Sequence, residues 1–188
     1  MSPAEKYKNI IKLLEVSNND LKEMKKLFHV EYLNNQFYVR LIFRNFFSII
    51  ESYLYSYREL IKLKIRTDNI DFPFDKEIIL NQKEVLLDSK GKVKTGDKFF
   101  NFKSSFMFTF NCISEVFEVD EIDLGNNNFE NIIHLSKRRN DITHPKDSEK
   151  QKIAKEEFIS LIKGFAWFTS CHSSIMLKVN FWITKKNN

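Results

Sequence analysis

The chain has 188 residues, of which 43% are hydrophobic and 29% charged, and these proportions exclude a disordered chain and suit one globular domain over residues 1–188. Only 4 Gly and 3 Pro interrupt it, which favours long helices over many short strands. The formal net charge is +5, but 25 acidic residues are interspersed with 30 basic ones, so a surface dedicated to non-specific nucleic-acid binding is not indicated.

The two cysteines and the N-terminus indicate the cellular compartment in which the protein is expected. Cys112 and Cys171 lie in apolar helical stretches without partners at zinc-site spacing, so we expect buried free thiols, no metal and no cofactor. The first residues lack the pattern of a signal peptide. The longest uncharged run, Gly164–Leu177, is too short to span a bilayer. We expect a cytoplasmic protein with no membrane segment.

The first segment predicts a helix that is soon interrupted. Ser2 is a candidate N-cap, and a short helix follows it to about Val16. The polar run 17–20 would end this helix, and Asn19 or Asp20 would cap the next one.

The next 45 residues, from Leu21 to about Ile65, contain neither Gly nor Pro. One or two helices are expected here, with a break near Asn34 and Asn35. The second, from about Gln36 to Lys64, should be the longest in the protein, because apolar residues recur along it at helical spacing.

Residues 67–100 differ from the rest. Helix-breaking pairs precede a stretch, around residues 84–96, in which two short apolar runs flank Ser89–Lys92. This pattern predicts a small hairpin-like excursion that packs on the helices.

The remaining sequence returns to helical spacing. We expect a helix from about Phe102 to Phe117, and a second one capped by Asn128 and stopped before Pro145. A long C-terminal helix follows it. The fold class predicted is therefore an all-α helical bundle with one excursion.

The stretch from His134 to Lys146 concentrates three consecutive cations and two histidines at a helix end. Arg139 and His144 would lie about 140° apart on an ideal helix, but Pro145 forces His144 out of helical geometry, so the imidazole can fold back towards the guanidinium. Arg matches phosphate oxygens, and His moves protons near neutral pH. The pair suits a phosphodiester.

The same residues carry a resemblance. Arg139-Asn140-Asp141-Ile142-Thr143-His144 resembles the signature of the HEPN superfamily: Arg, a polar residue, three to five more residues, then His, between two helices of a bundle. The string continuing through Pro145 and Lys146 is similar to a set of uncharacterised bacterial HEPN-like proteins. The likeness extends from the long second helix to the last helix, although only the motif is specific.

The resemblance implies metal-independent RNA cleavage by a homodimer, with a 2′,3′-cyclic phosphate as product. His144 would move the proton of the 2′-hydroxyl or of the leaving oxygen, and Arg139 would stabilise the phosphorane. Asn140 would hold the Arg or the phosphate by hydrogen bonds. From the residues themselves, Glu51 is the natural partner of Arg139 across the bundle, because a carboxylate near an apolar face needs one. The alternative that the residues leave open is a Glu51 that is exposed to solvent. Further phosphate-contacting candidates are Lys146 and Arg138.

Three functions stay open at this point. The first is a homodimeric endoribonuclease, in a phage-defence or toxin–antitoxin setting with an antitoxin or other protein partner. The second is a non-enzymatic module of the same fold that binds RNA or a nucleotide. The third is a structural helical dimer in which the motif only closes a helix end. His29, His134 and His172 are expected to be hydrogen-bonded structural residues, and Trp167 and Phe168 to serve a core or dimer interface.

Overall fold

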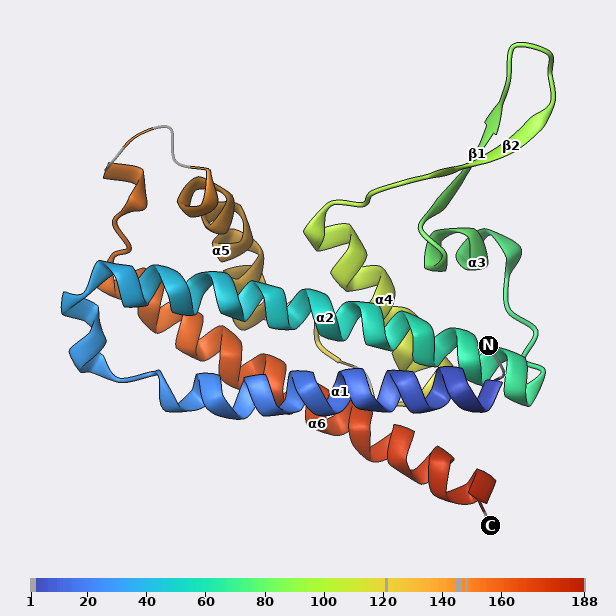
Figure 1. The fold of residues 1–188 in the computed structure, drawn as a ribbon, viewed down its shortest axis with the longest axis horizontal. Coiled ribbons are helices and arrows are strands. Elements are labelled where there is room, and N and C mark those ends of the chain that lie inside the picture. Colours follow the sequence, from blue (N-terminus) through green and yellow to red (C-terminus); the bar gives the residue numbers. More distant parts are fainter. Residues whose placement is uncertain (1–2, 121, 145–146, 148, 188) are drawn as a thin grey trace.

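The structure is a computed structural model that describes residues 3–120, 122–144, 147 and 149–187. Within these residues the chain is mainly helical, with one antiparallel hairpin (Figure 1). The helices are α1 (Pro3–Lys26), α2 (Gln36–Asp68), α3 (Phe74–Leu80), α4 (Phe102–Phe117), α5 (Asn127–Thr143) and α6 (Lys155–Asn187). Short 3-10 turns lie at Val30–Asn34 and Glu149–Gln151, and the strands are β1 (Lys83–Leu87) and β2 (Val93–Asp97).

Helix α2 forms the centre of the bundle. It contacts α1 along its length and α4, α5 and α6 on its other sides. Its buried face is rich in aromatic side chains, which meet phenylalanines of the other helices in a single core. The fully buried aromatic residues are Phe43, Phe46, Phe47, Tyr53, Tyr57, Phe106, Phe110, Phe129, Phe158 and Phe168.

The expected interruption of the first helix is wrong, since α1 runs unbroken through residues 17–20. Ser17 is buried and shares a 2.7 Å hydrogen bond with the Ser52 hydroxyl of α2. Asn18 Oδ1 lies 2.7 Å from the Tyr53 hydroxyl and 2.8 Å from His172 Nε2. Because these side chains bond to neighbouring helices, they do not compete for the backbone of their own helix. The predicted Ser2 cap lies outside the described residues.

The break before α2 is confirmed. Asn35 caps this helix through Oδ1, which accepts from the Phe37 amide at 3.1 Å. Helix α2 has 33 residues, but α6 has 33 as well, so α2 is not longer than the C-terminal helix. Cys112 and Cys171 are buried and free, as expected, and burial raises the pKa of each thiol to about 11.

The hairpin forms where it was predicted, but it does not pack on the bundle. β1 pairs with β2 in the register Lys83↔Asp97 to Leu87↔Val93, and the pair projects away from the helices (Figure 1). Leu87 and Val93 are exposed, and α3 is the element that β1 contacts most besides β2. The short apolar runs therefore serve cross-strand pairing rather than burial in the core.

Candidate functional site

The C-terminal end of α5 turns the motif towards α2. This helix begins at an earlier cap than expected, because Asn126 rather than Asn128 accepts from the first amides, at 2.9 and 3.0 Å. It ends at Thr143, whose hydroxyl donates to the Arg139 carbonyl at 2.9 Å. His144 follows with φ −125° and ψ 66°, outside helical geometry, and its side chain is exposed. A hydrogen bond between two motif residues thus holds the last turn of α5.

Arg139 faces Glu51 of α2, and this predicted pairing is confirmed. Arg139 Nη1 donates to Glu51 Oε1 at 2.9 Å, and the guanidinium lies over the Phe47 ring, 5.5 Å from its centroid. Arg139 Nε is buried and has no hydrogen-bond partner among the described residues. The Arg139 side chain is 22% exposed and that of Glu51 49% exposed, so the pair lies at the rim of the bundle. The Arg139 guanidinium therefore keeps at least one N–H group that no described residue accepts from.

These residues line an open groove of about 500 Å³ between α2 and α5. Arg139, Asn140, Thr143 and His144 form one wall, and Arg44, Ser48 and Glu51 form the other. The structure therefore brings together four of the predicted site residues: Arg139, His144, Asn140 and Glu51.

Sequence reasoning missed Arg44 and Ser48. Arg44 Nη2 donates to the Ile142 carbonyl at 2.8 Å, which fastens the end of α5 to α2 and leaves a second guanidinium in the groove. The signal that could have found both is spacing. Arg44, Ser48 and Glu51 follow at i, i+4 and i+7, a polar stripe on a helix whose other faces are largely apolar.

Of the two further phosphate contacts predicted, Arg138 is engaged elsewhere among the described residues. Arg138 donates to Glu157 Oε1 at 2.8 Å, to the Lys152 carbonyl at 2.5 Å and to the Lys150 carbonyl. Its guanidinium thereby anchors the connection between α5 and α6 and is not among the residues that line the groove. Lys146 lies outside the described residues.

Of the other histidines, His172 is the structural one. It is buried, with Nδ1 2.6 Å from the Tyr57 hydroxyl and Nε2 2.8 Å from Asn18 Oδ1. Burial lowers its pKa to about 4, so the ring is neutral at physiological pH. His29 and His134 are exposed, and neither lines the groove. Phe168 is buried, and Trp167 packs against Phe106 and Phe129, in agreement with a core role.

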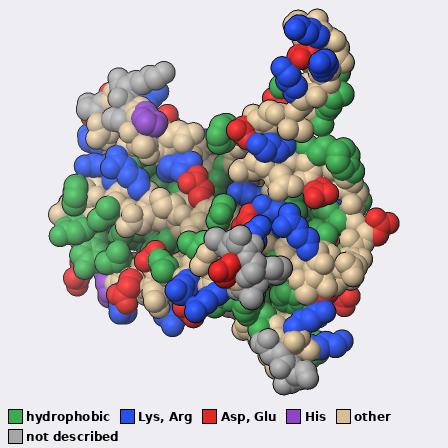
Figure 2. Space-filling view, turned by 45° about the vertical axis from the view of Figure 1, so that its right-hand side comes forward, with side chains coloured by type: hydrophobic (Ala, Val, Ile, Leu, Met, Phe, Trp, Pro, Cys, Tyr) green, Lys and Arg blue, Asp and Glu red, His purple; other side chains and the backbone are tan. Residues whose placement is uncertain are grey.

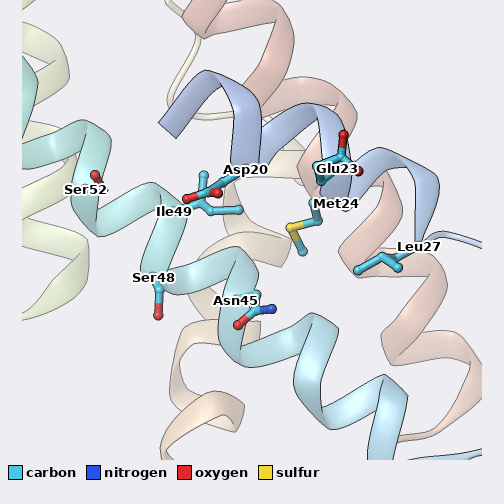
Figure 3. A pocket seen from close by; sticks show the side chains of 8 residues that line it. All are labelled: Asp20, Glu23, Met24, Leu27, Asn45, Ser48, Ile49 and Ser52. Carbon is cyan, nitrogen blue, oxygen red and sulfur yellow. The ribbon is translucent and has the colours of Figure 1, made fainter. Parts of the chain in front are cut away.

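A further hollow lies between α1 and α2 (Figure 3). Asp20 and Glu23 stand on its α1 side, and Asn45, Ser48 and Ser52 stand on its α2 side. Two carboxylates and no cation line it, so it would repel a phosphodiester. The groove beside α5, in contrast, is lined by two arginines, Arg44 and Arg139.

The groove offers two guanidinium groups, one carboxylate and one exposed imidazole. This set can bind an anion and transfer a proton without a metal ion. Among the described residues, no group of His, Cys, Asp and Glu is arranged to hold a metal, and no helix combines the length and apolar character needed to cross a membrane. Comparison with family models, with curated proteins and with solved structures found no match.

Proposed function

We propose that the chain is a HEPN-like, metal-independent endoribonuclease that acts as a homodimer and cleaves RNA in the groove between α2 and α5. One observation carries the proposal: the motif residues Arg139, Asn140 and His144 line one groove together with a second arginine, Arg44. A bacterial defence or toxin–antitoxin setting, with a neutralising protein partner, fits an enzyme of this kind.

The groove supplies the groups that such a cleavage needs. His144 accepts the proton of the 2′-hydroxyl, the 2′-oxygen attacks the adjacent phosphorus, and the bond to the 5′-oxygen breaks. A proton then passes to the leaving oxygen, so the products are a 2′,3′-cyclic phosphate and a 5′-hydroxyl end. Arg139 and Arg44 stabilise the negative charge that gathers on the phosphorane oxygens. Asn140 positions the phosphate by hydrogen bonds.

The alternative is a non-enzymatic module that binds RNA in the same groove. One contact favours it: Glu51 already neutralises part of the charge on Arg139, which reduces the stabilisation that this guanidinium can give to a phosphorane. Binding alone would need the guanidinium groups but not the proton transfer by His144. RNA cleavage that requires His144 therefore distinguishes the enzyme from the binding module.

The test is cleavage of total RNA in the presence of EDTA by the wild type, Arg139→Ala, His144→Ala and His134→Ala. His134 is a matched control, because it is an exposed histidine on the same helix that does not line the groove. Circular dichroism and thermal unfolding establish that each variant folds. End-group analysis of the fragments identifies the chemistry.

We expect the wild type and His134→Ala to produce 2′,3′-cyclic phosphate ends, and the two groove variants to lose them. Intact RNA with every folded protein, combined with RNA binding that Arg139→Ala abolishes, would favour the binding module. Cleavage that survives in His144→Ala would contradict the proposed site.

A further inference from the structure

A second pocket, of about 200 Å³, lies between α2 and α4 at the base of the hairpin. Phe100 and Phe108 contribute apolar walls, and the polar groups that converge on it include Arg58, Gln82 and Ser105. An apolar pocket with a few convergent polar groups is the usual form of a ligand site.

Arg58 brings an unbalanced charge to this pocket. Its Nη1 donates to the Ser105 hydroxyl at 3.1 Å, and no ion pair between described residues includes it. The adjacent carboxylate, Glu59, is bonded to Lys62 instead. Burial lowers the pKa of Arg58, and the nearby Glu59 and Tyr55 act in the opposite direction. A partly buried cation that forms no ion pair with a described residue is costly, and an anionic ligand would lower that cost.

The hairpin holds the pocket in shape. Gln82 precedes β1 and has φ 53°, in the left-handed region that a residue with a side chain rarely adopts. Its carbonyl accepts from the Lys98 amide at 2.9 Å, which closes the stem of the hairpin directly beside Phe100. This conformation is the usual one for a residue that directly follows a helix, here α3, and the Gln82 amide donates to the Ile79 carbonyl at 2.9 Å.

The pocket and the groove open along the same face of α2. Arg44, Ser48, Glu51, Tyr55 and Arg58 follow one another at spacings of three and four residues, so they form one stripe. Arg58 lies seven residues beyond Glu51, about 10 Å further along the helix axis. Between them Tyr55 is 50% exposed and presents an aromatic ring. The end of α5 and the hairpin both rise from this side of α2, and Figure 2 shows the surface between these projections hollowed.

We propose that this pocket is a nucleotide subsite for the RNA strand that occupies the groove. One unpaired base enters between Phe100 and Phe108, and Arg58 binds the adjacent backbone phosphate. The subsite rests on the proposed function, because it assigns the same strand to both places. It also specifies the substrate class: single-stranded RNA long enough to reach from Arg139 to Arg58, since a paired base would have to give up its pairing and stacking to enter the pocket, a cost that an unpaired base largely avoids.

The test is binding of a fluorescent 2′-O-methyl RNA strand, which lacks the 2′-hydroxyl proton and cannot be cleaved. Anisotropy is measured at several salt concentrations for the wild type, Arg58→Gln, Phe108→Leu and Lys12→Gln. Lys12 is the matched control, an exposed cation of α1 outside both sites. A strand carrying 4-thiouridine is also crosslinked to the wild-type protein by light, and the attached peptides are identified by mass spectrometry.

We expect Arg58→Gln to weaken binding about tenfold and to lower the slope of log affinity against log salt by about 0.7, as for the loss of one phosphate contact on a single strand. Phe108→Leu should weaken binding by a similar factor, about tenfold, without changing the slope, because stacking releases no counterions. Crosslinks should fall in the peptides that contain Phe100 and Phe108. Lys12→Gln should bind like the wild type.

The results separate the two proposals. RNA cleavage by the groove, together with binding that Arg58→Gln leaves unchanged and no crosslink at the pocket, would overturn the subsite alone. Binding through Arg58 by a protein that cuts no RNA would support the subsite and contradict the nuclease. A wild type that binds no strand at all would overturn both.

Discussion

Glu51 is the carboxylate that pairs with Arg139. The pair lies at the rim of the bundle, so Glu51→Gln should cost less than about 1 kcal/mol of unfolding free energy. If Glu51 positions the guanidinium, the same change should lower kcat for RNA cleavage between about tenfold and 100-fold with little effect on KM, because misplaced catalytic groups cost rate rather than binding. Steady-state kinetics and urea unfolding measure the two effects. A faster enzyme would instead identify Glu51 as a competitor of the phosphate.

His172 should make the stability of the fold depend on pH. Its pKa is about 4 in the folded protein, against 6.5 for an ordinary histidine, so between these values the unfolded chain binds a proton that the folded one does not. The free energy of unfolding should therefore fall as the pH drops from 6.5 to 4, by about 3 kcal/mol in total.

Urea unfolding at a series of pH values tests this dependence. His172→Gln should flatten the stability profile between pH 4 and 6.5, whereas His134→Gln, which removes an exposed histidine, should leave it as in the wild type. Equal slopes in all three proteins would show that His172 is not the titrating group.

At this scale, part of the site follows from sequence and part does not. The pairing of Glu51 with Arg139 was predictable, because a carboxylate beside an apolar face needs a partner. Arg44 belongs to no motif, and it joins the site only because α5 ends beside it in the folded protein. The partners of Arg138 come from two carbonyls of the next connection and from Glu157, and local sequence does not say where that connection runs.

Helices α5 and α6 approach each other closely at Gly164. A Cβ atom at Gly164 would lie 2.8 Å from Ile132 Cγ1, inside the van der Waals distance, and Ile132 is fully buried. Gly164→Ala should therefore destabilise the protein by about 1–2 kcal/mol, because overpacking outweighs the gain in helix propensity.

A double-mutant cycle with Ile132→Ala measures this contact. The double variant should be less destabilised than the sum of the two single variants, since the added methyl group fills the space that the lost side chain leaves. Strict additivity of the unfolding free energies would mean that the two helices do not meet through this pair.

Helices and strands could be predicted where residues close in the sequence determine them. The hairpin follows from a turn at Gly91, which has φ 70°, between two short apolar runs. Local signals misled at residues 17–20, where Asn18 bonds to side chains of two other helices. The short helix α3 was not foreseen, because seven residues are too few to show a helical period.

The whole molecule should work as a pair, because an apolar patch adjoins the groove. Phe37 is 63% and Leu41 38% exposed in the first turns of α2, about two turns and one turn before Arg44, and Figure 2 shows hydrophobic side chains gathered at this end. Phe37→Glu with Leu41→Glu should give monomers by light scattering, whereas Leu177→Glu, at another exposed apolar site, should not.

A mixed dimer tests whether each site combines Arg139 of one protomer with His144 of the other. The Arg139→Ala and His144→Ala proteins are unfolded, mixed and refolded together. If the site is shared, the mixture should cleave RNA, since one site of each mixed dimer keeps both residues. Wild-type monomers, or inactive mixed dimers, would contradict a shared site.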